Sequence, residues 1–288
     1  MSAYVVGIDG SEKAHDALSW ARSVAAPDDT IVALHAWEVP VVTGYEAAIV
    51  VDTTTIEQAA REFLEGAVAE ADDQRVSGRL VPGHPGHALV DVAKELGGDT
   101  NLVVGHAGTG KASLLLGSTA NYAIHHTHVP VVVVRGECRL PVRTVAVGID
   151  KSHGQDPDAP SLAALRWTLT RLGIERIEVH HADFVPGVAA GPIVEPGLES
   201  ERAVADDEHR LRDAITRAIG ERGERANAAE IVPMVSAGTG AFALIEASRT
   251  VDLVVIGTHG RRGIVELIRG STSLEVTAHA HCPVVVAH

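Results

Sequence analysis

The sequence predicts two tandem Rossmann-like α/β domains, each a doubly wound domain with a five-stranded parallel sheet of strand order 3-2-1-4-5. Three observations lead to this fold class. The chain has 288 residues, which is enough for about two domains of ordinary size. Short runs rich in Val and Ile alternate with Ala-rich stretches of helical spacing. A series of short motifs in the first half of the chain also returns, in the same order, in the second half.

The predicted strands are short apolar runs. In the first half they lie at Tyr4–Ile8, Ile31–His35, Leu102–Val104 and Val131–Val134. Their residues are apolar throughout instead of alternating with polar ones, which is typical of parallel strands covered by helices on both faces. We therefore expect a sheet that is buried on both sides.

The segments between these strands carry the spacing of helices. One begins at Ala14, a second at Ile56 and a third at Ala88, each with apolar residues three or four positions apart. Alternation of strands and helices predicts parallel strands joined by right-handed crossovers.

The internal repeat consists of five pairs of motifs. The second copy is longer only between them, which indicates a duplicated domain. We expect domains at 1–136 and 142–288, with a short polar stretch between them. The pairs are Val5–Asp9 with Ala146–Asp150, His35-Ala36 with His181-Ala182, Leu102–Gly108 with Val254–Gly260, Gly117–Thr119 with Gly270–Thr272, and Val129–Val133 with Cys282–Val286.

The composition excludes several classes of protein. Asp and Glu number 38 against 24 Lys and Arg, a formal net charge of −14, which argues against nucleic acid or an anionic membrane as the main partner. The two cysteines, Cys138 and Cys282, form no CxxC or zinc-binding spacing, so a disulfide scaffold or zinc finger is excluded. No apolar run approaches the ~18 residues of a membrane span, and no secretion signal is visible, so we expect a cytoplasmic protein.

An aspartate follows the first strand of each copy, at Asp9 and Asp150. Ligands of open α/β sheets bind beyond the carboxyl ends of the strands, where a carboxylate can accept hydrogen bonds from ribose hydroxyls. The same residue can instead form an Asx turn or cap the helix that follows. The spacing alone leaves both roles open.

The fourth strand of the second copy runs into a glycine-rich loop. Gly257 and Gly260 precede Gly270-Ser271, which opens a predicted helix. Glycines let backbone N–H groups approach an anion closely, and a helix N-terminus adds unpaired N–H groups and a positive dipole end. Ser271 can cap the helix or donate to a phosphate. The same layout follows the fourth strand of the first copy, so the sequence predicts an anion site in this position.

These residues resemble a known family. The spacing Gly257-x2-Gly260-x9-Gly270-Ser271 resembles the ATP-binding signature of universal stress proteins, and the Gly-Ile-Asp, His-Ala and Pro-Val-Val motifs match that family too. The resemblance covers nearly the whole chain, once in each copy, so the chain is similar to a tandem universal stress protein. It implies a nucleotide partner, ATP bound with Mg²⁺.

The resemblance also implies which residues hold the nucleotide. The aspartate would hold the ribose, the backbone near the alanine of the His-Ala motif would face adenine, and the glycine-rich loop and helix start would line the phosphates. These residues are Asp9, Ala36, Gly105, Gly108, Gly117, Ser118 and Thr119 in the first copy, and Asp150, Ala182, Gly257, His259, Gly260, Gly270, Ser271 and Thr272 in the second.

Each copy departs from the family pattern. In the first, eight residues instead of nine separate its second and third loop glycines, and Ala107 replaces the loop histidine. In the second, five extra residues follow Asp150, and the acidic stretch 153–158 would repel a nucleotide unless Mg²⁺ intervenes. We expect nucleotide in at least one copy, and the sequence leaves open which.

Two other nucleotide-binding signals compete with this interpretation. Residues 105–112 nearly match a P-loop, but Ala112 stands where Ser or Thr should hold Mg²⁺, and the predicted helix starts later, at Gly117. Residues 238–243 read G-x-G-x-x-A, but no acidic residue ends a strand about 20 residues further on, so a tight strand-to-helix turn is favoured over a dinucleotide site.

The sequence favours a regulatory function. No paired acid and base is visible, so we name no catalytic residue and expect at most slow ATP hydrolysis. We also name no metal ligand, because histidines 125, 126 and 128 lie near a helix end, where the dipole favours them, without nearby Cys or carboxylate ligands. The alternative is a nucleotide-free dimerisation scaffold. In the family that this chain resembles, the closing strands meet, which implies a homodimer or an intramolecular pseudo-dimer.

Overall fold

A computed structural model describes residues 1–38, 53–106, 116–150, 159–171, 173–183, 209, 211–213, 215–216, 229–258 and 271–288. Contacts within the chain divide it into two compact units, here called domain 1, which ends at Val134, and domain 2, which begins at Arg135. Among the described residues, no helix is both long and apolar enough to cross a membrane.

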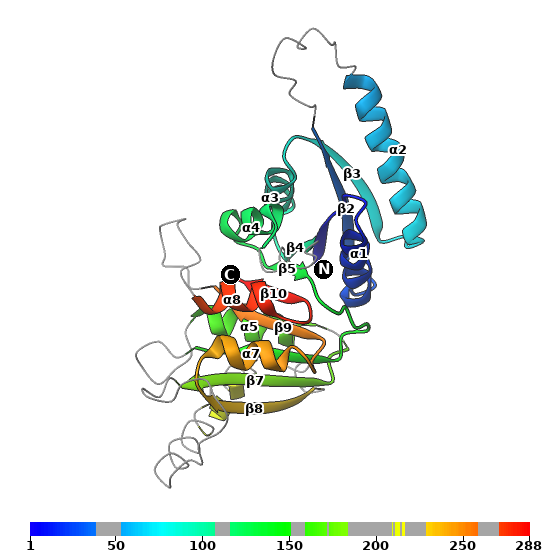
Figure 1. The fold of residues 1–288 in the computed structure, drawn as a ribbon. Coiled ribbons are helices and arrows are strands. Elements are labelled where there is room, and N and C mark those ends of the chain that lie inside the picture. The colour runs from blue at the N-terminus through cyan, green and yellow to red at the C-terminus, as the bar shows by residue number, and fades with distance from the viewer. Residues whose placement is uncertain are drawn as a thin grey trace, which may run out of the picture. The chain divides into compact units, whose positions relative to one another are not determined.

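Domain 1 alternates strands and helices as the sequence predicts (Figure 1). Each helix connects two parallel strands, with α1 and α2 on one face of the sheet and α3 and α4 on the other (Figure 1). The elements are β1 (Ala3–Gly7), α1 (Glu12–Val24), β2 (Thr30–Trp37), α2 (Thr53–Ala71), β3 (Val76–Pro82), α3 (Pro85–Leu96), β4 (Thr100–Gly105), α4 (Ser118–His126) and β5 (Val131–Val134).

The described elements of domain 2 follow the same order, with no described element between its second and third strands. Its strand β9 again precedes the helix that leads into the closing strand. The elements are β6 (Thr144–Gly148), α5 (Ala159–Leu169), β7 (Arg176–Asp183), β8 (Glu230–Ala237), α7 (Gly240–Ala247), β9 (Leu253–Gly257), α8 (Ser271–His279) and β10 (Val284–Ala287).

Strand pairing confirms the predicted topology in both domains. Domain 1 has the order β3-β2-β1-β4-β5 and domain 2 the order β8-β7-β6-β9-β10, with every one of these pairs parallel. This is strand order 3-2-1-4-5, written twice. The first and fourth strands are therefore neighbours, and the carboxyl ends of both lie at the switch point where such sheets bind ligands.

The core of each domain is a sheet covered on both faces. Strands β4 and β5 are buried along nearly their whole length, as are β9 and β10, and β1 and β6 are buried except at their two ends. The largest buried side chain of α1, Trp20, packs edge-on against Tyr4 of β1. The unbroken apolar runs of the sequence are explained by this two-sided burial.

The segment that leads into domain 2 is hydrogen-bonded to that domain. Arg135, which is buried, donates through Nη1 to the Thr277 carbonyl in the last turns of α8. The Glu137 amide donates to the His281 carbonyl over 2.8 Å, and Arg139 donates to the Arg249 carbonyl over 2.8 Å. The polar stretch that the sequence predicts between the domains is thus fixed to domain 2 by side-chain and backbone hydrogen bonds.

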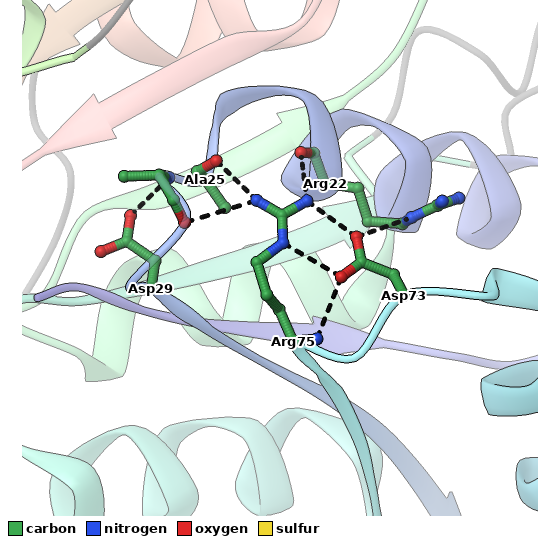
Figure 2. Close-up of polar contacts among 6 residues, drawn as sticks. Arg22, Ala25, Asp29, Asp73 and Arg75 are labelled. Atoms are coloured by element: carbon green, nitrogen blue, oxygen red, sulfur yellow. Dashed lines mark hydrogen bonds and ion pairs between the residues drawn. The ribbon is translucent and has the colours of Figure 1, made fainter.

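One ion-pair network joins the end of α1 to the segment between α2 and β3 (Figure 2). The Arg75 guanidinium donates to the Asp73 carboxylate over 2.7 and 3.0 Å. It also donates to the carbonyls of Arg22 and Ala25 over 3.0 and 2.7 Å. These carbonyls belong to the end of α1, where the cation also complements the helix dipole. The hydrogen bonds from Arg75 hold the pKa of Asp73 well below its usual range.

We predict that Arg75→Met lowers the free energy of unfolding of domain 1 by about 2 kcal/mol, because Asp73 and the carbonyls at the end of α1 lose charge-assisted hydrogen bonds. Urea denaturation of the full chain measures this loss. The matched control is Arg61→Met, whose partner Glu57 forms an exposed i,i+4 pair on α2 and is worth less than about 0.5 kcal/mol. Equal effects of the two substitutions would show that the network contributes no more than a surface ion pair.

The same network predicts a pH dependence. The pKa of Asp73 is lowered in the folded state. The stabilisation that this carboxylate contributes is therefore fully present at pH values above its unfolded-state pKa of about 3.9, and it is lost as the pH falls through its folded-state pKa. The stability difference between wild type and Arg75→Met should therefore shrink as the pH falls from about 6 to about 3. Urea titrations at these two pH values test this expectation, and a constant difference would contradict it.

Candidate functional site

The residues that the sequence singles out in domain 1 come from neighbouring strand ends. Val6 of β1 pairs with Ala33 of β2 on one side and with Val103 of β4 on the other. Asp9 and Ala36 therefore each lie three residues beyond the same row of the sheet, and Gly105 lies two residues beyond it. The register brings these three positions to one edge, as expected for parallel strands.

Asp9 forms the turn that leads into α1. Its Oδ1 accepts hydrogen bonds from the Ser11 amide over 2.9 Å and from the Ser11 hydroxyl over 2.6 Å. Ser11 is the N-cap of α1, and its oxygen accepts from the Ala14 amide over 3.1 Å. The Asx-turn role is thus present. Asp9 is exposed, and its second oxygen, Oδ2, accepts no hydrogen bond from a described residue, so the ribose contact stays a prediction.

The histidine of the repeated His-Ala motif has a structural role that the sequence analysis missed. The Nδ1 of His35 donates to the Ile8 carbonyl over 2.7 Å, and the Nδ1 of His181 donates to the Ile149 carbonyl over 3.1 Å. Each acceptor directly precedes the aspartate that follows the first strand. The histidine therefore fixes the loop that carries this aspartate to the second strand. Its repetition beside an alanine in both copies is the signal that could have revealed this role.

The first glycine of each loop is required by backbone packing. A Cβ on Gly105 would collide with the backbone of Lys13, and a Cβ on Gly257 would collide with the backbone of Pro160. Lys13 lies in the first turn of α1, and Pro160 lies in the first turn of α5. These two glycines allow the fourth strand of each domain to end against the start of its first helix.

Gly117 differs from them. It is exposed, it is the N-cap of α4, and a Cβ there would meet no heavy atom of the described residues within 4 Å. A glycine has no side chain with which to cap the helix. Within the described part of the chain, the first N–H groups of α4 are therefore open to an acceptor from outside, and Ser118 is exposed beside them while Thr119 is half-buried. Packing explains Gly105, but it does not explain why a glycine stands at 117.

The site of domain 2 is only partly described. Asp150 is exposed, its amide donates to the Ser161 hydroxyl over 2.8 Å, and Ala182 is half-buried at the end of β7. Helix α8 begins at Ser271, and Thr272 is exposed. The other predicted positions lie outside the described residues: Gly108 of the first copy, and His259, Gly260 and Gly270 of the second.

The dinucleotide-like motif forms a tight turn between β8 and α7, as the sequence favours. Thr239 is the N-cap of α7, and its hydroxyl accepts from the Phe242 amide over 3.2 Å. The equivalent position of domain 1, His84, caps α3 in the same way, with Nδ1 accepting from the Gly86 amide over 3.2 Å. These contacts account for both turns without a ligand.

The histidines near the end of α4 are held by their own helix. His126 Nδ1 donates to the Tyr122 carbonyl over 2.9 Å, and its ring stacks on Tyr122 at 3.9 Å between centroids. Desolvation lowers the pKa of His125, and the neighbouring His126 contributes. In the described part of the chain, no group of three or more His, Cys, Asp or Glu side chains is placed to hold a metal ion.

A hollow of about 400 Å³ lies elsewhere in domain 1, between β3 and α3. Its charged and aromatic lining is Arg79, His84, His87, Asp91 and Glu95, and the Arg79 and Glu95 side chains form an ion pair. None of the residues predicted to hold a nucleotide lines it. The hollow is lined by residues of β3, α3 and the turn between them, and it does not coincide with the strand ends described above.

Comparison with known proteins decides the family. The model of the universal stress protein family matches residues 3–135 and 141–288. The chain belongs to the universal stress protein family. The two matches cover nearly the whole chain, one in each half, so it is a tandem member of this family.

Relatives of similar length have the same tandem organisation. A universal stress protein of Mycobacterium tuberculosis strain H37Rv is 27% identical over 317 aligned residues, which cover 98% of this chain and 94% of that protein. A crystal structure of a universal stress protein from Archaeoglobus fulgidus is similar in fold, with a TM-score of 0.65 at 18% identity, covering 99% of this chain and 95% of the other. A universal stress protein solved in complex with cAMP is 26% identical over 46% of this chain and 97% of its own, with a TM-score of 0.34.

We predict that Gly105→Ala and Gly257→Ala each lower the free energy of unfolding by about 2 kcal/mol, because the added Cβ overlaps backbone that must move. Gly66→Ala is the matched control. A Cβ at Gly66, inside α2, meets nothing within 4 Å, so this substitution should stabilise by about 0.5–1 kcal/mol. Thermal or urea unfolding measures the predicted loss of stability in the two loop variants and the predicted gain in Gly66→Ala. A neutral Gly105→Ala would contradict the packing role.

Proposed function

We propose that this universal stress protein binds ATP with Mg²⁺ at the carboxyl edge of at least one of its sheets, and that binding regulates the protein. The observation that carries the proposal is Gly117, an exposed glycine at a helix N-terminus that it cannot cap with a side chain, where the packing of the described residues gives no reason for glycine. Backbone N–H groups at such a terminus suit a phosphate.

The neighbouring strand ends support the same ligand. In the proposed arrangement, the Oδ2 of Asp9, to which no described residue donates, accepts from the ribose, and the backbone of half-buried Ala36 faces adenine. Ser118 and Thr119 add hydroxyl donors beside the phosphates. In domain 2, Asp150, Ala182 and the start of α8 take the corresponding roles through the internal repeat.

Regulation suits these groups better than rapid catalysis. The proposed phosphate contacts are backbone N–H groups and hydroxyls, which hold charge but do not accept the proton of an attacking water. Mg²⁺ is part of the proposal because the chain carries a formal charge of −14, and a divalent cation reduces repulsion of the triphosphate. We further propose a cytoplasmic protein, acting as a homodimer or an intramolecular pseudo-dimer.

The first test is mass spectrometry of small molecules released when freshly purified protein is denatured. Wild type should release ATP or AMP. Loss of the nucleotide in Ser118→Ala would identify domain 1 as the binding copy, and loss in Ser271→Ala would identify domain 2. If no nucleotide is released, and Mg-ATP does not raise the melting temperature, the nucleotide-free scaffold is the correct function.

A sharper prediction concerns Gly117→Ala. The added methyl group occupies the space in which a phosphate would contact the helix N-terminus, so ATP affinity should fall about tenfold, equivalent to one charge-assisted hydrogen bond. Titration calorimetry measures the affinity, and the melting temperature should change little because no atom of the described residues, apart from the chain neighbours, lies within 4 Å of the new Cβ. Gly66→Ala serves as the control that leaves ATP affinity unchanged.

A further inference from the structure

Phe63 is a large apolar side chain that domain 1 leaves partly open to solvent. It lies in the middle of α2, and 38% of its surface is exposed. Its ring packs edge-to-face against His35 of β2, with 4.8 Å between ring centroids and an angle of 61° between planes. The ring is therefore held in one orientation at the end of β2, although α2 does not bury it.

The tip of the same ring reaches the loop between β1 and α1. A Cβ on Gly10 would lie 3.4 Å from Cε2 of Phe63, so the ring covers this residue. Gly10 has a φ of +81°, a conformation that side chains disfavour. Phe63 thus contacts the residue directly after Asp9, which the proposed function assigns to the ribose.

The His35 ring, against which Phe63 packs, is itself held by a hydrogen bond. Its Nδ1 donates to the Ile8 carbonyl over 2.7 Å, so the imidazole against which Phe63 packs cannot turn freely. Ala36, whose backbone is proposed to face adenine, is the next residue along β2. The Phe63 ring therefore contacts a neighbour of each proposed ligand contact, Gly10 beside Asp9 and His35 beside Ala36, and part of its surface stays exposed.

We propose that Phe63 is a base-stacking residue of domain 1, which recognises a purine ring by its exposed aromatic surface. This inference rests on the proposed nucleotide binding and adds the group that distinguishes a nucleotide from a bare polyphosphate. A fixed aromatic ring suits this task, because stacking on a base gains contact area with little loss of side-chain freedom.

The two domains differ at this point. The internal repeat places Lys151 of domain 2 where domain 1 has Gly10. A lysine there removes the bare backbone over which the Phe63 ring lies in domain 1. Base stacking by Phe63 over a glycine is therefore assigned to domain 1.

The test compares ligands with and without a base on the full-length protein. Calorimetry with Mg-ATP, AMP and inorganic tripolyphosphate is carried out on wild type, Phe63→Ala and Phe63→Trp. Phe63→Ala should weaken ATP and AMP about tenfold at one class of site, the usual effect of losing one stacking partner. It should leave tripolyphosphate unchanged, and Phe63→Trp should restore binding. Phe242→Ala is the matched control, because Phe242 is an exposed phenylalanine on α7 of domain 2.

The outcomes separate the two proposals. If wild type binds ATP and Phe63→Ala binds it equally well, the stacking inference is wrong and the proposed function stands. If wild type binds no nucleotide, the proposed function fails and the inference fails with it. Should Phe63→Ala not fold, Phe63→Trp still decides: its added tryptophan fluorescence must change with ATP and not with tripolyphosphate.

Discussion

The constraint on which each domain depends is the close approach of its fourth strand to its first helix. At Gly105 and at Gly257 the strand ends so near the backbone of that helix that a Cβ would overlap it. This contact places the start of the first helix beside the switch point between the first and fourth strands. The loop that carries the aspartate, the end of the fourth strand and the last helix can then surround one region at the sheet edge.

A second repeated contact gives that edge its rigidity. His35 and His181 each connect the second strand to the last carbonyl before the aspartate. Both copies form this hydrogen bond between the same residue types, a histidine of the second strand and an isoleucine before the aspartate. A ligand that bound at the edge would therefore meet a loop whose position is fixed in advance, which reduces the entropy lost on binding.

The duplicated domains use one fold with different side chains at equivalent positions. The third helix is capped by His84 in domain 1 and by Thr239 in domain 2, and either side chain satisfies an exposed backbone N–H. The residue after the aspartate is Gly10 in one copy and Lys151 in the other. The substitution at the cap preserves a structural role, whereas that at the loop changes the surface that a ligand would meet.

The sequence by itself determined the fold class, because unbroken apolar runs and helical spacing are local patterns that indicate buried strands and amphipathic helices. The repeat indicated the same strand order in both halves. It also placed Asp9, Ala36 and Gly105 at strand ends, which the observed register brings to one edge of the sheet. The tertiary structure alone decided what each residue does there. Gly105 and Gly117 look alike in the sequence, but a Cβ on Gly105 would overlap backbone, whereas a Cβ on Gly117 would meet no atom of the described residues. The contact between Phe63 and His35 joins a helix to a strand, and no local pattern encodes it, since it depends on how distant segments pack.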